Sequence, residues 1–423
     1  MANTNLREVS MDTLIEILEH GQFSHIYLKQ VLDKYAYFEK NERAFITRLV
    51  NGTVERKLTL DFIINNYSKT KVNKMKPLIR TILRMGVYEI YYMDSVKSFA
   101  TCNEYVKLAK KRGFSGLSGF VNGVLRSIVR DYGNLNIDDK SAKYSMPQWI
   151  IQKFTDDFGE KMCKEILEGF FESTGLCIRA NLKKTTVEEL ISLLEAQNIS
   201  VKRAEGLDSA LFLTNFDSVS AIKGFDEGLF YIQDYSSQLV ASMAEIKSKD
   251  LVLDVCAAPG GKALHAAELA GDGFVEARDL TDAKVAIIEE NIARMNAKNI
   301  SAKKWDALIL DESSIEKFDV VIADLPCSGL GIIRKKPDIK YNQTIEQLNE
   351  LSELQAKILE VVCNYVKKGG TLCYSTCTIN KAENEDQIKA FVKHHKDFEI
   401  KEMKQLFPTK EHDGFYICVL KKK

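Results

Sequence analysis

The chain has 423 residues, of which 45% are hydrophobic and 28% charged, and its formal net charge is zero. These values describe an ordinary soluble, globular protein of two or three domains with room for substantial cores. No apolar run approaches the length of a membrane-spanning helix, and the first residues lack the pattern of a signal peptide, so neither segment and no membrane partner is expected.

The nine cysteines are odd in number and dispersed, which predicts reduced thiols and a cytoplasmic location rather than a disulfide framework. No CxxC pair occurs, and no histidine cluster accompanies Cys373 and Cys377, so no metal site is expected. Charge is unevenly spread, because residues 1–140 hold 22 basic and 15 acidic side chains, a net charge of +7. This excess suggests a polyanionic partner, but on charge alone a solvated surface with a modest lysine excess is the preferred interpretation.

Residues 1–137 are predicted to form a compact helical bundle. Pro77 is well placed to open a helix, since proline is favoured at the first helical position. The polar, turn-rich segment 132–147 reads as a linker. Apolar residues recur every three or four positions, as helices require, through residues 11–20, 44–67, 77–93 and 120–132.

Two further domains are predicted downstream. Residues 145–240 mix short helices and strands, which indicates a small α+β subdomain of RRM-like type. Residues 241–423 alternate strand and helix, which predicts a doubly wound, Rossmann-like α/β sheet with the C-terminal strand 414–422 at its edge. The strands expected in this last domain are 251–256, 274–278, 301–305, 320–324 and 371–375, and the helices are 262–270, 281–295, 344–367 and 381–394.

The segment DVCAAPGGK, residues 254–262, places a glycine turn between a strand and a helix, where the backbone can approach a ligand closely. It matches neither the Walker A pattern nor GxGxxG, which disfavours a nucleoside triphosphate or a dinucleotide. A single carboxylate at a strand end is more often a helix cap. Four at successive strand ends beside a glycine turn predict an adenosine-bearing cofactor, and these four are Asp254, Asp279, Asp306 and Asp324.

Cys327 and Cys377 stand in polar turns directly after strands, unlike the other cysteines, most of which are interpreted as core residues. A thiolate that adds to C6 of cytosine makes C5 nucleophilic, so that C5 can capture a methyl group from a sulfonium donor; a base then removes the C5 proton. These two thiols and the carboxylate of Asp324 supply the groups that this chemistry needs. Spacing alone leaves open which cysteine attacks.

Three segments resemble the motifs of the RNA cytosine-C5 methyltransferases of the Sun/Nop2/NSUN family, in the family's order. They are DVCAAPGGK, ADLPCSGLGIIRKKPDIK and YSTCTINKAENE. The N-terminal stretch, with RTILRMGVYEIYYM and FVNGVLRSIV, is similar to the NusB-type RNA-binding domain. A NusB domain followed by a methyltransferase domain is the architecture of the RsmB-type 16S rRNA cytosine-C5 methyltransferases, and the resemblance covers nearly the whole chain.

This resemblance implies S-adenosylmethionine as the cofactor and assigns the site residues one by one. Cys377 would be the nucleophile, Cys327 would assist product release, and Asp324 would border both cofactor and base. Asp279 would hold the ribose and Asp306 the adenine. The remaining cofactor-binding positions would be Cys256, Ala257, Ala258, Pro259, Gly260, Gly261 and Lys262.

The partner implied is 16S ribosomal RNA, free or in a partial small-subunit particle, bound by a monomer. Arg334, Lys335 and Lys336 follow the Pro-Cys turn and are expected to grip the strand that carries the target base. Basic side chains of the helical domain, including Lys69, Lys71, Lys74, Lys76, Lys111 and Arg112, are expected to track phosphates. Two alternatives remain: the same chemistry on transfer RNA, and a non-catalytic RNA-binding assembly or antitermination factor.

Overall fold

The computed structural model describes residues 5–93, 98–172 and 175–423. Residues 1–4, 94–97 and 173–174, which fall within the predicted helical domain and small subdomain, lie outside the described part. The chain divides into two compact units. The helical unit comprises Met1–Glu168 and Ile333–Asn342, and the sheet unit comprises Gly169–Ile332 and Gln343–Lys423. The predicted domain ranges 1–137, 145–240 and 241–423 stay predictions, since this division follows compactness alone.

The helical unit confirms the all-helical prediction for the N-terminal part. Apolar side chains from successive helices form one core, as the three- and four-residue spacing predicts. No helix of the described residues is long and apolar enough to span a membrane. The helices are α1 (Leu6–Leu18), α2 (Ser24–Lys34), α3 (Lys40–Glu55), α4 (Lys57–Tyr67), α5 (Pro77–Tyr92), α6 (Ser98–Lys111), α7 (Ser118–Arg130), α8 (Lys140–Tyr144), α9 (Gln148–Gly169) and α14 (Ile339–Asn342).

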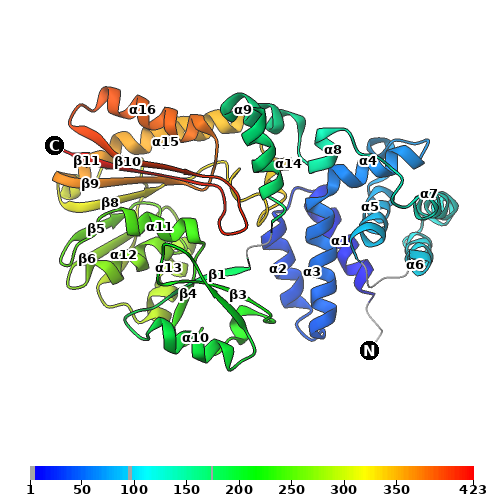
Figure 1. Ribbon diagram of the computed structural model, residues 1–423, viewed down its shortest axis with the longest axis horizontal. Helices are drawn as coiled ribbons and strands as arrows, with labels where there is room; N and C mark the ends of the chain where they lie inside the picture. Colours follow the sequence, from blue (N-terminus) through cyan, green and yellow to red (C-terminus); the bar gives the residue numbers. More distant parts are fainter. Residues whose placement is uncertain (1–4, 94–97, 173–174) are drawn as a thin grey trace. The chain divides into compact units, whose positions relative to one another are not determined.

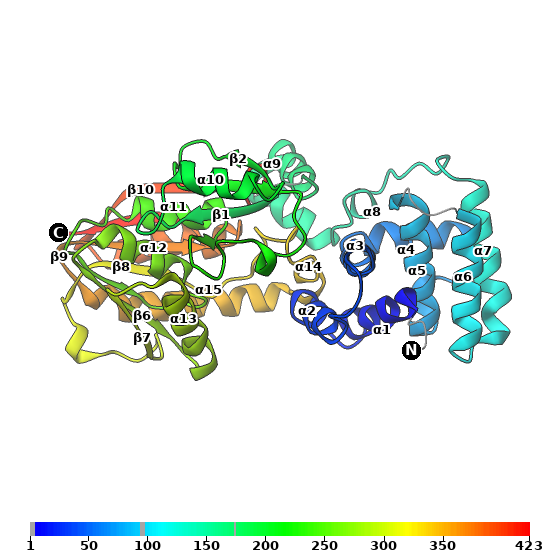
Figure 2. The same cartoon turned by 90° about the horizontal axis from the view of Figure 1, so that it is seen from below.

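Helices α5, α6 and α7 lie side by side in the helical unit (Figure 2). Pro77 opens α5, as predicted. A glycine permits the close approach of α5 to its neighbours, because a Cβ at Gly86 would lie 2.9 Å from a Leu125 side-chain carbon on α7. Gly159 interrupts α9 with φ 80°, a conformation that favours glycine.

The linker predicted at 132–147 is wrong in its second half. Residues 140–144 form α8, whose Ala142 and Tyr144 are buried. The Thr59 hydroxyl of α4 donates to the Ala142 carbonyl at 2.5 Å. Two apolar contacts and a buried hydrogen bond therefore hold a segment whose composition is polar, and they make it part of the helical unit.

The segment Ile333–Asn342 belongs to the helical unit although the sequence around it folds in the sheet unit. The Lys340 ammonium is buried and donates to the Glu55 carbonyl at 2.7 Å, and its burial lowers its pKa to about 7. Asp338 accepts a hydrogen bond from Ser24, and Tyr341 packs against the helical core. A part of the core of this unit therefore comes from a segment distant in the sequence.

The first part of the sheet unit carries a four-stranded antiparallel sheet in the order β2-β3-β1-β4. Helix α10 packs on it, and its N-terminus has a capping box in which Thr186 and Glu189 each bond the other's backbone amide. The Arg179 guanidinium of β1 is buried and pairs with Glu268 of α12 at 2.5 Å. The elements are β1 (Leu176–Ala180), α10 (Val187–Glu195), β2 (Ser200–Arg203), β3 (Ala210–Thr214), β4 (Phe230–Ile232) and α11 (Tyr235–Met243).

The larger sheet confirms the doubly wound prediction. Its order is β10-β11-β9-β8-β5-β6-β7, and β9, β8, β5, β6 and β7 pair in parallel. Helices α11, α12 and α13 cover one face, and α15 and α16 the other, so the apolar central strands are buried on both sides (Figure 1). The elements are β5 (Leu251–Asp254), α12 (Gly261–Ala270), β6 (Phe274–Asp279), α13 (Asp282–Met295), β7 (Ile300–Lys304), β8 (Phe318–Asp324), α15 (Ile345–Val362), β9 (Val366–Thr376), α16 (Glu385–His394), β10 (Phe398–Leu406) and β11 (Phe415–Lys422).

The predicted edge position of the C-terminal strand is wrong. Strand β11 lies inside the sheet, antiparallel to both β9 and β10, and β10 forms the edge. The sequence of β10, FEIKEMKQL, does not predict a strand, for two reasons. Charged side chains dominate it, and an irregularity between Ile400 and Glu402 breaks the alternation that identifies strands.

Candidate active site

The four predicted acidic residues lie at one edge of the larger sheet. Asp254, Asp279 and Asp324 are the last residues of β5, β6 and β8, and Asp306 lies two residues beyond the end of β7. Because β8, β5, β6 and β7 are neighbours and run in parallel, their carboxyl ends meet at the same edge. This is the edge where ligands of doubly wound sheets bind.

The glycine loop, Cys256–Lys262, connects β5 to α12 at this edge. Gly260 has φ 105°, a conformation that favours glycine, immediately before the helix begins. A Cβ on Gly261 would lie 2.9 Å from the ring of Tyr231, whose hydroxyl donates to the Pro259 carbonyl at 3.2 Å. Strand β4 of the small sheet therefore packs directly on the glycine loop.

Asp279 holds the glycine loop from the neighbouring strand. One of its carboxylate oxygens accepts from the Ala258 amide at 2.9 Å, and the other accepts from the Leu280 amide and pairs with the Lys284 ammonium at 2.9 Å. Asp306 is half-buried, and its carboxylate accepts from the Leu308 amide at 2.9 Å. Both carboxylates therefore stabilise the turns at the strand ends.

Asp254 is buried, and neither of its carboxylate oxygens has a hydrogen-bond partner among the described residues. Burial raises its pKa to about 7, against the opposing charge of Lys262, and the charge of Asp324 adds to the rise. A buried carboxylate without donors is costly, because it loses its hydration without compensation. This unsatisfied group beside the glycine loop indicates a place for a ligand that carries donors or positive charge.

Lys262 joins the glycine loop to the end of β8. Its ammonium lies 2.6 Å from an Asp324 carboxylate oxygen, and the Ser375 hydroxyl donates to the other oxygen at 2.7 Å. Burial alone would lower the pKa of Lys262, but the charge of Asp324 and its hydrogen bond raise it. Lys262 is therefore a fixed cation beside the carboxylate.

The two predicted reactive thiols lie side by side. The sulfur atoms of Cys327 and Cys377 are 3.2 Å apart, and both side chains are partly exposed. The hydrogen bond to Cys377 and burial raise the pKa of Cys327 well above its usual value. The loops that carry them, the Cys327 loop (residues 325–331) and the Cys377 loop (residues 377–384), follow the adjacent strands β8 and β9. Among the described residues, no group of three or more His, Cys, Asp or Glu side chains is placed to hold a metal ion.

The basic residues predicted to contact RNA are distributed differently. Arg334, Lys335 and Lys336 lie in Ile333–Asn342 and so in the helical unit, with Lys335 exposed and the other two half-buried. Lys111 and Arg112 pair with acidic residues of α1. Four lysines near the start of α5 are exposed: Lys69, Lys71, Lys74 and Lys76.

Sequence reasoning missed several residues that build the site. Ser375 stands in the quoted YSTC segment, where a hydroxyl two residues before a reactive cysteine was a usable signal. Glu383 stands in the polar KAENE stretch, which contains two glutamates and gives no sign of which one is buried. Tyr231 resembles any aromatic residue of a strand. Only the fold brings these three side chains to the site.

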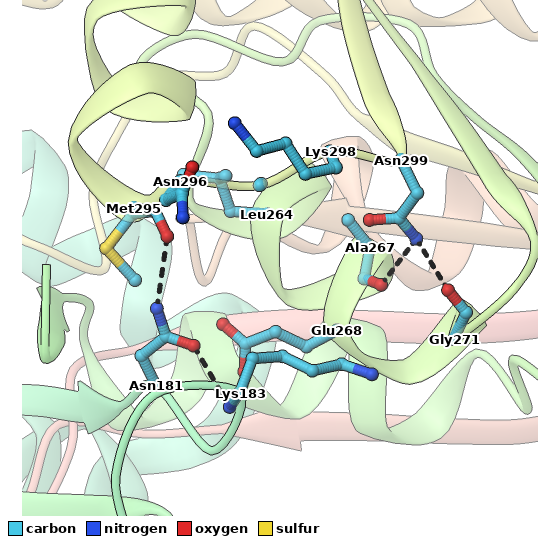
Figure 3. Close-up of a pocket in the computed structure, with 11 residues that line it drawn as sticks. Asn181, Lys183, Leu264, Ala267, Glu268, Gly271, Met295, Asn296, Lys298 and Asn299 are labelled. Carbon is cyan, nitrogen blue, oxygen red and sulfur yellow. Dashed lines mark hydrogen bonds between the residues drawn. The ribbon is translucent and has the colours of Figure 1, made fainter.

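A cavity of about 290 Å³ in the sheet unit is lined by residues other than these (Figure 3). The amide of Asn299 donates to the carbonyls of Ala267 and Gly271, and that of Asn181 donates to the Met295 carbonyl. The drawn amides therefore serve to fasten backbone segments together. The cavity is lined by Asn181, Lys183, Leu264, Ala267, Glu268, Gly271, Met295, Asn296, Ala297, Lys298 and Asn299, none of which belongs to the predicted site.

Models of known families match all three parts of the chain. The model of the 16S rRNA methyltransferases RsmB/F matches residues 241–421. The NusB family matches residues 4–130, and a ferredoxin-like domain of RsmF/B-like methyltransferases matches residues 146–220. These matches confirm the resemblance that the three motifs and the helical stretch indicated.

Similar proteins span the whole chain. A probable ribosomal RNA small subunit methyltransferase B from Bacillus subtilis (strain 168) is 34% identical over 450 residues, which cover 100% of both proteins. A protein of the same name from Synechocystis sp. (strain ATCC 27184 / PCC 6803 / Kazusa) is 32% identical and covers 98% of this chain and 99% of its own. The crystal structure of PH0851 matches 99% of both chains with a TM-score of 0.83 at 23% identity, which shows the same fold.

Proposed function

Because this chain belongs to the RsmB/F family of 16S rRNA methyltransferases, we propose that it methylates C5 of a cytosine in 16S ribosomal RNA, with S-adenosylmethionine as methyl donor and Cys377 as nucleophile. The observation that carries this proposal is the 3.2 Å separation of the Cys327 and Cys377 sulfur atoms. Two adjacent thiols beside a carboxylate, at the ligand-binding edge of the sheet, suit addition to a pyrimidine ring better than transfer to an amine.

The residues at the glycine loop fit the proposed cofactor. Asp254 offers two buried oxygens without donors, which suits the positively charged end of S-adenosylmethionine. The small residues of the loop leave room for close approach of a ligand to the backbone. Asp279 and Asp306 would face the ribose and the adenine, and Cys256–Lys262 would line the pocket. When bound, the cofactor supplies an electrophilic methyl group.

The protein's own groups divide the work at the base. Cys377 stands at the position that the Thr-Cys motif of the family assigns to the nucleophile, and its thiolate attacks C6. Asp324, held by Lys262 and Ser375, stabilises the base in its added form. After methylation of C5, loss of the C5 proton restores the double bond and expels the Cys377 thiolate. Cys327 assists this elimination as the neighbouring acid–base group.

Contacts to RNA are proposed on the helical unit. The four exposed lysines Lys69, Lys71, Lys74 and Lys76 would contact phosphates without reading sequence. Arg334, Lys335 and Lys336 would hold the strand beside the target base, which must leave its stack to react. The nine free cysteines are consistent with a reducing cytoplasm as the place of this reaction.

A denaturing gel tests the assignment of the two thiols. Wild type, Cys327→Ala, Cys377→Ala and the control Cys163→Ala, which alters a buried cysteine of the helical unit, are each incubated with 16S rRNA and S-adenosylmethionine. We expect a denaturant-resistant protein–RNA adduct to accumulate with Cys327→Ala only, because attack proceeds but elimination fails. Cys377→Ala should form no adduct and transfer no methyl group.

The alternatives give different results. An adduct with Cys377→Ala instead would exchange the two roles. Methylation of transfer RNA and not of 16S rRNA would favour the transfer RNA alternative. If wild type methylates neither free 16S rRNA nor a partial small-subunit particle, the non-catalytic assembly factor replaces the proposed function.

A further inference from the structure

A buried carboxylate that the proposed chemistry does not use belongs to the Cys377 loop and accepts hydrogen bonds from the Cys327 loop. The Glu383 side chain is fully buried. Its carboxyl group accepts four hydrogen bonds, two to each oxygen. The donors are the Ser328 amide at 2.9 Å, the Ser328 hydroxyl, the Asn380 side-chain amide at 2.9 Å and the Gln355 side-chain amide at 3.0 Å.

These donors belong to both loops. Ser328 follows Cys327 directly, and Asn380 lies three residues after Cys377. The Ser328 hydroxyl also lies 2.8 Å from that of Thr378, which links the loops a second time. Through Glu383 the residues next to each cysteine therefore share one acceptor group.

Gln355 and Tyr374 anchor this arrangement to the regular elements. The Gln355 side-chain amide of α15 donates both to Glu383 and to the Pro326 carbonyl, the latter at 2.8 Å. The Tyr374 hydroxyl of β9 donates to the Glu383 carbonyl. Both flanks of Cys327, at Pro326 and at Ser328, are thus fixed by groups that belong to one hydrogen-bonded set.

We propose that Glu383 is a positioning residue for the two thiols: its carboxylate holds the Cys327 loop and the Cys377 loop together, so that the sulfur atoms stay 3.2 Å apart. The significance of this role for methylation rests on the proposed function. Glu383 forms no hydrogen bond to either cysteine and acts through Ser328 and Asn380. Since misplacement by about 1 Å lowers rates by up to about 100-fold, such a clamp matters for a two-thiol reaction.

The rate of disulfide formation between Cys327 and Cys377 measures this geometry without RNA or cofactor. Diamide, a diazene, takes up the two thiol protons and two electrons as the S–S bond forms, and becomes the hydrazine. Alkylation and mass spectrometry of the denatured protein count the thiols lost from the nine, and peptide mapping assigns the bond. In Glu383→Gln an amide NH2 replaces one carboxylate oxygen and cannot accept from the two donors that face it, so the loops separate. We expect the rate to fall at least about tenfold.

Two further variants make the result decisive. Glu385→Gln changes a partly exposed carboxylate two residues away that pairs with Lys389, and it should react at the wild-type rate. Ser328→Ala removes one of the four donors to Glu383. Because a single hydrogen bond is lost, the rate of disulfide formation should fall by about threefold. If the melting curve shows that Glu383→Gln does not fold, the rate of disulfide formation in Ser328→Ala serves as the test of the proposal.

An unchanged rate in folded Glu383→Gln, or in Ser328→Ala where that variant decides, would overturn the proposal. Slower disulfide formation supports the positioning role even if the protein methylates no RNA. The proposed function is therefore tested separately, by the methylation assay. With an active wild type, a second readout applies. Glu383→Gln should keep the wild-type Kd for S-adenosylmethionine within about twofold while kcat falls at least about tenfold, because the clamp lies at the thiols. A loss of cofactor affinity that accounts for the whole defect would contradict it.

Discussion

At the glycine loop, Asp254 is buried, and no residue in the described part of the chain forms a hydrogen bond to either of its oxygens. At the thiol loops, Glu383 is equally buried, and each of its oxygens accepts two hydrogen bonds. The two halves of one site therefore differ in how a buried carboxylate is compensated. In the thiol half, the protein itself supplies the hydrogen bonds that the buried carboxyl group needs. In the glycine-loop half, the described residues supply no hydrogen bond to the Asp254 carboxylate. We infer that the first half is organised before substrate arrives and that the second is completed by a ligand.

Lys262 is the side chain that joins the two halves, and removing it should have the largest effect. Lys262→Met leaves Asp324 and Asp254 without their shared cation, so we expect kcat/KM for methyl transfer to fall about 100- to 1,000-fold. Lys304→Met, which removes an exposed cation paired with Asp282, is the matched control and should be near wild type. If kcat/KM of Lys262→Met fell by less than about threefold, Lys262 would not couple the two halves of the site, and this interpretation would be wrong.

Two glycines test how rigid each half is. A Cβ on Gly331 would meet the Gly414 carbonyl oxygen at 2.1 Å and that of Cys377 at 2.8 Å, so backbone must move. On Gly261 it would meet side chains and no backbone: the ring of Tyr231 at 2.9 Å and Gln233 at an ordinary contact distance of 3.6 Å. In single-turnover assays we expect Gly331→Ala to lose about 100-fold in rate, and Gly261→Ala to weaken cofactor binding severalfold. Gly123→Ala has open space and serves as control. Equal losses in the two variants would contradict a difference in rigidity.

Both carboxylates lie in quoted motifs, yet only one of them was recognised in the sequence. Asp254 follows an apolar run that predicts a strand, and parallel strands bring their ends to one edge, so its place in the site could be predicted. The same logic placed Cys327 and Cys377. Glu383 could not be found this way, because its hydrogen-bond partners belong to α15, the Cys327 loop and β9, which meet only in the folded chain.

Two parts of the fold escaped sequence reasoning for similar reasons. Strand β10 pairs only with β11 at the sheet edge, and edge pairing does not require the apolar pattern that identifies buried strands. The segment Ile333–Asn342 reads as a basic loop of the methyltransferase domain, but Lys340 and Asp338 find their partners in helices about 300 residues earlier. No local pattern reports a contact of that sequence separation.

The pH dependence of cofactor binding examines the unsatisfied half directly. With its pKa raised to about 7, Asp254 of the unliganded protein ionises as pH rises through neutrality. Besides burial, the groups that act on its pKa are Lys262, Asp324, the Cys256 backbone amide and Asp279. A cationic ligand favours the ionised form, so calorimetry should show S-adenosylmethionine binding about tenfold more weakly at pH 6 than at pH 8. S-adenosylhomocysteine, which lacks the sulfonium charge, should depend less on pH, and Asp254→Asn should abolish the dependence. A flat profile in wild type would remove Asp254 from the cofactor site.

The stability of the unliganded protein should show the smallest effect. The folded pKa of Asp254, about 7, lies above the unfolded value of about 3.9, so the folded state holds a proton that the unfolded state releases. The contribution of Asp254 to the free energy of unfolding is therefore fully present below about pH 4 and is lost as pH rises to about 7. Asp254→Asn should raise the melting temperature by a few degrees at pH 8 and by less at pH 5. Equal shifts at both values would mean that the carboxylate has a partner.

The membership of Ile333–Asn342 in the helical unit has a consequence for how such chains can be recombined. A cut after Glu168 does not release a self-contained module, because the excised part leaves behind the segment that carries Tyr341 and Lys340. The catalytic fragment in turn would expose a lysine and an aromatic ring that are buried or half-buried in the intact protein. We therefore expect a chimera in which the N-terminal part is exchanged between relatives to fold only when residues 333–342 are exchanged as well. The two stretches, although distant in the sequence, must then match each other.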